Sequence, residues 1–180
     1  MLGDIRTGCT AAMALAGGNT GPVSSLDEFW RSFRAAVVAF PLSLLMLALV
    51  PHGFEVTGKL IVADILGYIC TWTAFPLIMV FVAERMQVFP HYQRFIIATN
   101  WANLLQGAVF TFVVLVNTTG IMPDAISAML FMGAWFWILL FKWRLARHGL
   151  GIAHFPAVAI VLLDLALRLV IARAALWFGV

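Results

Sequence analysis

Two ionisable residues inside a long apolar stretch are the strongest candidates for chemistry in this sequence. Asp164 and Arg168 are spaced by four residues within a run of aliphatic side chains. A helix would place both on one face, with the acid N-terminal to the base. An unpaired charge at the centre of a bilayer costs about 2.5–3.5 kcal/mol or more. We therefore expect an internal Asp164–Arg168 ion pair that faces neighbouring helices, with Asp64 from another apolar stretch able to reach Arg168.

Neutral polar residues inside a third apolar stretch extend this candidate cluster. Asn103 or Gln106 could satisfy Asp164, and Asn100 falls on the same arc of a helix as Asn103. The cluster has two interpretations, because a structural latch between helices and a polar pathway that lines a cavity need the same residue types. The sequence leaves both open. The candidate site residues are Asp64, Asn100, Asn103, Gln106, Asp164 and Arg168.

Motifs for catalysis, cofactors and metals do not stand out in the sequence. Cys9 and Cys70 are far apart and have no metal-binding or redox spacing. There is no glycine-rich phosphate loop, no metalloprotease motif and no hydrolase nucleophile motif. All histidines fall in loops or next to them, away from the middle of the apolar stretches, and three of them offer at most a weak metal site. We predict no catalytic residue, no metal and no cofactor, and a protein that is not an enzyme. The histidines are His52, His91, His148 and His154.

The elements that must position these residues are five apolar stretches. Hydrophobic residues make up 63% of the chain and charged residues only 11%, whereas a soluble domain is about half apolar and a quarter charged. A helix needs roughly 20 apolar residues to cross a bilayer. The sequence predicts an all-α integral membrane bundle of five transmembrane helices over residues 25–180, preceded by a flexible cytoplasmic tail at 1–24. The stretches are Phe29–Val50, Leu60–Ala83, Phe95–Thr118, Ala125–Phe141 (extended by Lys142 and Trp143) and Ile152–Phe178.

The distribution of lysine and arginine predicts the orientation. Basic residues are in excess in the loops that stay in the cytoplasm. Eight of them fall on one side of an alternating chain, and only Lys59 falls on the other. We expect a cytoplasmic N-terminus, an outside C-terminus and a place in the cell (inner) membrane. The net charge of +3 then marks the inner face and needs no nucleic-acid partner. The eight are Arg6, Arg31, Arg34, Arg85, Arg94, Lys142, Arg144 and Arg147.

Small residues predict how the helices meet. Helices in lipid pack closely where side chains are small, because burial of apolar surface gives no preference for helix over lipid. Two stripes with a spacing of four predict helix–helix contacts, and the second makes the third span the most central. The stripes are Ala63, Gly67 and Thr71 in the second span, and Asn103, Gly107 and Thr111 in the third.

Several local signals predict helix boundaries and kinks. Ser25 and Glu28 form a capping-box pattern that would open the first helix, and Pro123 with Asp124 suits the start of the fourth. The glycines at 149 and 151 predict a break between the fourth and fifth helices. The prolines at 41 and 76 lie inside spans and predict kinks.

The end of the fourth span carries a family resemblance. The segments Trp137–Lys142 and Arg147–Leu150, followed by the small residue Ala157, resemble the bacterial branch of the Yip family of five-span membrane proteins. The resemblance implies a non-enzymatic protein that organises membranes or binds partners, and it carries over no catalytic residue. The tyrosine–glycine–proline motif of eukaryotic members is missing, so binding of a Rab-type GTPase is not implied.

Two functional hypotheses follow, with a third less favoured. The first is a membrane-organising or partner-binding subunit, whose partners are the lipid bilayer and other membrane proteins or a second copy of the chain. The alternative is a small transporter or channel subunit that uses the intramembrane charged and amide residues. An enzyme acting on lipids would need acids or histidines clustered at the cytoplasmic interface, and only Glu84 and His91 lie near there.

Overall fold

The computed structural model describes residues 2–19, 26–49 and 58–179, and this part of the chain is helical, without β-strands. The all-α fold predicted from the sequence is therefore confirmed. The elements are α1 (Leu2–Ala16), α2 (Leu26–Ser32), α3 (Arg34–Leu49), α4 (Gly58–Arg85), the short 3₁₀ helix η1 (Phe89–His91), α5 (Tyr92–Thr118), α6 (Asp124–Leu150) and α7 (His154–Gly179).

Five helical segments of the described chain are long and apolar enough to cross a bilayer, so this is a multi-pass membrane protein. The first segment combines α2 and α3, which are separated at Phe33. The backbone there has bonds of the shorter i to i+3 kind, and the hydroxyl of Ser32 donates to the carbonyl of Phe29 at 2.6 Å. The segments are Glu28–Met46, Gly58–Arg85, Phe89–Thr118, Asp124–Leu150 and His154–Phe178.

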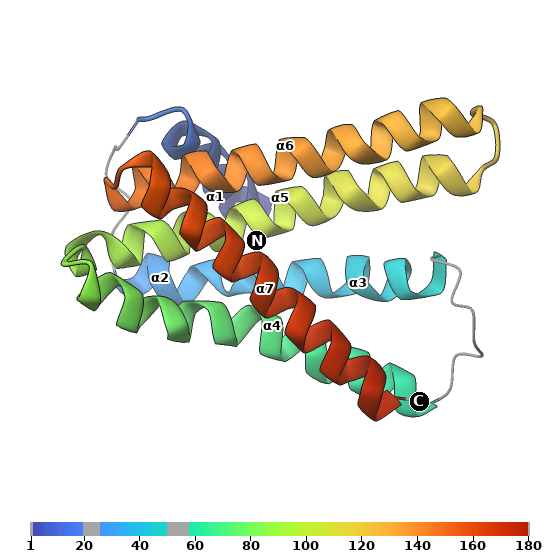
Figure 1. Cartoon of the computed structure of the whole chain (residues 1–180), viewed down its shortest axis with the longest axis horizontal. Coiled ribbons are helices and arrows are strands. Elements are labelled where there is room, and N and C mark those ends of the chain that lie inside the picture. The colour runs from blue at the N-terminus through green and yellow to red at the C-terminus, as the bar shows by residue number, and fades with distance from the viewer. Residues whose placement is uncertain (1, 20–25, 50–57, 180) are drawn as a thin grey trace.

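The helices alternate in direction and α5 occupies the centre (Figure 1). Half of the residues in the most apolar window of α5 are buried, compared with 6–22% in the other four segments. Helix α5 packs against α1, α2, α3, α4 and α6, while α4 packs mainly against α7. The prediction that the third span is the most central is confirmed.

The N-terminal segment corrects one prediction. Residues 2–16, expected to belong to a flexible tail, form α1 and pack against α5 and α6. Ala12 and Leu15 are buried, and Gly8 lies directly on the indole ring of Trp101, where a Cβ would come within 2.3 Å of the ring. The small residues, which are typical of a flexible tail, are the ones that let α1 approach Trp101 of α5 this closely.

Cys9 lies in the same contact. Its thiol points to the carbonyl of Trp101 at 3.9 Å, and burial raises the pKa of the thiol. A thiol with a raised pKa holds little thiolate at neutral pH. Cys9 is therefore a packing residue and not an activated nucleophile.

The helix ends follow the predicted signals in part. Pro123 is the N-cap of α6, Asp124 lies in its first turn, and Gly151 ends the helix in the left-handed conformation with φ of 68°. The predicted break at Gly149 is wrong, since this glycine lies inside α6. It serves packing between helices, because a Cβ there would come within 3.1 Å of Phe95. The capping-box residue Ser25 lies outside the described residues.

Both span prolines lie inside helices, Pro41 in α3 and Pro76 in α4. The carbonyl of Pro76 accepts a hydrogen bond from the hydroxyl of Tyr92 at 3.0 Å. This bond ties the middle of α4 to the start of α5.

We expect Gly8→Ala to loosen α1, since the new methyl group would overlap the ring of Trp101, and overpacking of this kind typically costs about 1–3 kcal/mol. Gly3→Ala is the matched control on the same helix, because a Cβ there has no neighbouring atom within 4 Å. Limited proteolysis of the purified protein should cut α1 faster in Gly8→Ala alone. Equal cleavage of both variants would contradict the packing of α1 on Trp101.

The predicted orientation can be tested with single cysteines in a background in which Cys9 and Cys70 are alanine. We expect an impermeant maleimide to label Thr119→Cys, in the turn between α5 and α6, in intact cells. His91→Cys, at the opposite end of α5, should react only after permeabilisation. The reverse pattern would place the N-terminus outside.

Candidate functional site

The carboxylate of Asp164 is the centre of a buried charged cluster. Asp164 lies on α7 and is 5% exposed. The ammonium group of Lys142, from α6, donates to Oδ2 of Asp164, and Nε of Arg168 lies 3.1 Å from both carboxylate oxygens. The structure thus contains the Asp164–Arg168 pair that the four-residue spacing predicts, with a second cation added to it.

Asn103 brings α5 into the same cluster. Its side-chain carbonyl accepts from Nη2 of Arg168 at 3.1 Å and from the Lys142 ammonium at 3.5 Å. The sequence places Asn103 as a partner for Asp164, whereas the structure uses it as a second acceptor for the two cations. Because a carboxylate cannot satisfy every donor of a lysine and an arginine, the amide oxygen completes the arrangement. We call Asn103, Lys142, Asp164 and Arg168 the charged cluster.

Lys142 is the member that sequence reasoning missed. We expected α6 to end near Trp143 and Lys142 to stay at the cytoplasmic surface. Instead α6 continues to Leu150, which places Lys142 about 12 Å inside that end at helical rise. The signal lay in the sequence as an apolar and small stripe that continues past Trp143 at helical spacing. Its members, all buried, are Phe141, Leu145, Ala146, Gly149 and Leu150.

Asn100 lies apart from the charged cluster. Its amide nitrogen donates to the hydroxyl of Ser32 at 2.9 Å, and both residues are buried. This hydrogen bond joins α5 to the point where α2 and α3 meet. Asn100 is thus part of a separate polar contact between helices, although it was expected on the same arc as Asn103.

A cavity of about 700 Å³ adjoins the charged cluster, and we call it the vestibule. Its walls come from α3, α4, α5, α6 and α7. They contain four aromatic residues, Tyr68, Trp72, Phe110 and Trp135. The polar and small lining residues include Asp64, Gly67, Thr71, Asn103, Gln106, Gly107, Thr111, Lys142, Asp164 and Arg168. Five of the six predicted site residues therefore line one cavity, and Asn100 does not.

The vestibule lies on one side of the charged cluster only. Its lining reaches Asp64 near the start of α4 and Ala175 near the end of α7. These two helix ends lie at the same end of the bundle in Figure 1. On the other side, a cavity of only about 20 Å³ touches Lys142 and Asp164. Beyond it Phe75, Phe95 and Leu145 belong to the packed core.

The predicted small-residue stripes differ in what they contact. A Cβ at Gly67 would lie 3.3 Å from Ala175 and 3.7 Å from Ile171, so this glycine permits the close contact of α4 with α7. Ala63 is buried, and the hydroxyl of Thr71 donates to the carbonyl of Gly67 at 2.8 Å. Gly107 was expected at a helix contact, but a Cβ there would meet no atom within 4 Å. It borders the vestibule instead.

Gln106 is the least satisfied polar residue of the vestibule. It is 4% exposed, and among the described residues its side-chain nitrogen has no hydrogen-bond partner. An unsatisfied buried donor costs about 1–3 kcal/mol. The position therefore has a cost in stability that no contact within the described chain offsets.

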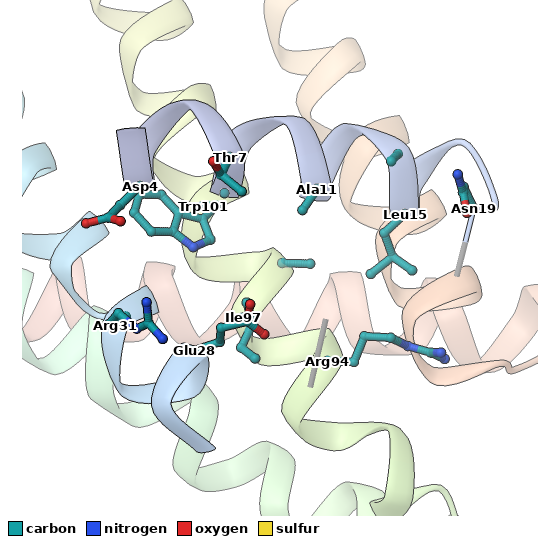
Figure 2. A pocket seen from close by; sticks show the side chains of 13 residues that line it. Asp4, Thr7, Ala11, Leu15, Asn19, Glu28, Arg31, Arg94, Ile97 and Trp101 are labelled. Atoms are coloured by element: carbon teal, nitrogen blue, oxygen red, sulfur yellow. The ribbon is translucent and has the colours of Figure 1, made fainter. Parts of the chain in front are cut away.

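A second cavity, of about 300 Å³, lies between α1, α2 and α5 (Figure 2). Its lining residues belong to the end of the bundle opposite the vestibule. Its charged lining residues are two acids, Asp4 and Glu28, and two bases, Arg31 and Arg94. Arg94 donates from Nε and Nη2 to the carbonyl of Gly149, at 3.2 and 2.9 Å. The charges balance and have protein partners, which is typical of a structural contact between helix ends.

The described residues contain no group of three or more histidine, cysteine, aspartate or glutamate side chains that could hold a metal ion. Trp143 stacks on His154, with ring centroids 5.4 Å apart. The charged cluster and the vestibule can hold charge and hydrogen-bond a polar molecule.

The chain has no match among protein-family models, curated proteins or solved structures. The resemblance to the Yip family therefore stays a prediction.

Asp164→Leu should strongly destabilise the protein, because it leaves Lys142 and Arg168 close together without their shared carboxylate. Breaking a buried ion pair by removing one partner typically costs about 3–5 kcal/mol. The double variant Lys142→Met with Asp164→Leu should recover most of the loss, since Arg168 can turn toward the vestibule. Thermal unfolding in detergent measures both. Equal midpoints for the single and double variants would show that Lys142 and Asp164 are not coupled.

Proposed function

We propose that this chain is a non-enzymatic protein of the cell (inner) membrane that binds a small polar solute in the vestibule, as a small transporter or channel subunit. The observation that carries the proposal is the position of three ionised side chains at the closed end of a cavity of about 700 Å³. The sequence alone favours a partner-binding subunit. The vestibule is the reason that we place the transport role first.

The cavity is difficult to explain if the charged cluster is only a latch. A latch between helices requires satisfied charges and close packing around them, because packing is the main force that holds helices together in lipid. Here the side chain of Arg168 remains 38% exposed beside the cavity, while that of Asp164 is 8% exposed. Charged residues that face a water-filled cavity in a membrane mark solute or ion pathways.

The asymmetry of the bundle supports transport with access from one side at a time. The vestibule reaches the charged cluster from the end that we predict to be outside. The other end is closed by the packed core, in which the rings of Phe75 and Phe95 meet edge to face at 6.1 Å, and by α1. The break at Phe33 and the proline at 76 are positions where helices change direction most readily. A conducting state would open this inner half.

A second candidate function rests on the lipid-facing side of α5 and α6. Only 6% of the most apolar window of α6 is buried within the chain. A shallow groove of about 440 Å³ runs between the two helices, and Gly133 on its wall has open space around a Cβ. A transmembrane helix of a partner, or a second copy of the chain, would find close approach there. This is the membrane-organising or partner-binding role predicted from the sequence.

Two glycine variants separate these functions. Gly107→Phe should fill the vestibule, and Gly133→Phe places the same ring on the lipid-facing groove; neither glycine has an atom within 4 Å of a Cβ. We expect proteoliposomes with the parent protein to swell in isosmotic solutions of permeant solutes faster than empty liposomes. Gly107→Phe should abolish the difference, and Gly133→Phe should retain it.

Two other results would contradict the transport proposal. One is parent proteoliposomes that swell no faster than empty ones with potassium chloride, sodium benzoate and glycerol. The other is loss of co-purifying membrane proteins, or of a dimer, in Gly133→Phe alone, which would assign the partner-binding role.

A further inference from the structure

We infer that the vestibule takes an organic anion with an apolar body, a carboxylate of the benzoate kind. The inference rests on the proposed solute-binding function and deepens it by naming the chemical class. It stands on three features of the described residues: the charge balance of the cluster, the unsatisfied amide of Gln106, and the aromatic walls.

The charge balance leaves one positive charge in excess at the closed end of the vestibule. Lys142 and Arg168 share a single carboxylate, that of Asp164, and their other acceptor, Asn103, is neutral. An uncompensated positive charge at membrane depth is unfavourable. A bound anion would remove that excess. Arg168 is the cation it would meet first, because its side chain is 38% exposed and that of Lys142 is 15% exposed.

Asp64 lies toward the outer part of the vestibule and not at the level of the charged cluster. It lines the same vestibule, but it lies three residues before Gly67, which is level with Ile171 and Ala175 of the antiparallel α7. Helical rise then places the Cα atoms of Asp64 and Arg168 about 12 Å apart along the helix axes. Asp64 also has an interaction of its own. It therefore belongs to the outer part of the vestibule, away from Asp164.

Gln106 supplies a donor that needs an acceptor. Its side-chain nitrogen is buried without a partner in the described chain, and the residue lies one helical turn beyond Asn103 on the vestibule side of α5. A carboxylate bound to Arg168 would place an oxygen on the same wall, where a turn of the buried amide would let its nitrogen donate to that oxygen. A hydrogen bond from a neutral donor to a charged acceptor is stronger than one between neutral groups, so this contact would offset the cost of burying the amide.

The walls select the rest of the ligand. Trp72 and Trp135 line the vestibule, and Phe110 packs edge to face on Trp135 with ring centroids 5.8 Å apart. Aromatic walls with a few convergent polar groups are typical of sites for small amphiphilic molecules. An inorganic anion would leave these walls without a contact, so the geometry favours a carboxylate with a ring or a short alkyl chain.

The test is titration of the full-length protein in nanodiscs of phosphatidylcholine with sodium benzoate, benzylammonium chloride and benzamide at constant ionic strength. These probes share a ring and differ in charge. The heat measured with Gly107→Phe, in which the vestibule is filled, reports partitioning of the probe into lipid and is subtracted. We expect saturable heat for benzoate alone. We also expect Gln106→Leu to weaken benzoate binding roughly ten- to hundredfold, while Gln93→Leu, at the other end of α5, leaves it unchanged.

A folding defect would not explain weaker binding by Gln106→Leu, since replacing an unsatisfied buried amide with an apolar residue should leave the unfolding midpoint equal or higher. Benzoate binding that Gln106→Leu leaves unchanged would overturn the inference. Binding of benzylammonium or benzamide in place of benzoate would also overturn it, while the proposed function would stand. No saturable binding of any probe overturns the anion class, and the swelling assay then decides the proposed function separately.

The same carboxylate chemistry could come from the membrane as a fatty acid. Repeating the titration in nanodiscs that contain lauric acid distinguishes the two sources. Competition that raises the apparent Kd for benzoate more than tenfold would assign the site to the lipid-borne anion, whereas an unchanged Kd supports a water-borne solute. Either result keeps the inferred carboxylate.

Discussion

The bundle depends on one carboxylate that two cations share. Asp164 holds Lys142 of α6 and Arg168 of its own helix, and Asn103 of α5 accepts from both cations. Because an unsatisfied charge in hydrocarbon costs several kcal/mol, α5, α6 and α7 cannot separate at this level without a large penalty. The cluster therefore fixes the register of three helices near mid-membrane. It also divides the molecule into a packed half on one side and the vestibule on the other.

The packed half is closed by small residues and by α1. Gly8 lets α1 lie on Trp101, and Gly149 lets α6 lie on Phe95. Arg94 joins the start of α5 to the end of α6 through the carbonyl of Gly149. The other half has the opposite chemistry. Gly107 faces open space, and the vestibule walls are aromatic and polar. One fold thus combines a tightly packed half with a charged site beside a cavity, which is the combination that the proposed transport role requires.

The sequence was sufficient for features that depend on local periodicity. The five spans follow from hydropathy, and the Asp164–Arg168 pair follows from a spacing of four on one helix. Lys142 was missed because positively charged residues near the end of a hydrophobic run are usually at the interface, although the stripe through Leu145 and Leu150 continues α6 at helical spacing. Helix α1 was missed because glycine and alanine have low intrinsic hydrophobicity, and their value here comes from a contact with Trp101, 93 positions after Gly8. Asn100 and Asn103 could not be separated, since their different partners lie on other helices.

Gln106 is the residue that best distinguishes a site from a scaffold. Every charged group of the cluster has a hydrogen-bond partner, although one positive charge is in excess, so the hydrogen bonds of the cluster are compatible with a purely structural role. A buried amide whose nitrogen has no partner in the described chain adds nothing to such a role and lowers stability, and an apolar residue of the same size would serve the packing better. Residues that cost stability beside a cavity are commonly explained by what the cavity binds. For the solute that we infer, the position of Gln106 next to an excess positive charge favours a negative charge, because an amide donor and a cation both bind an oxygen that carries negative charge.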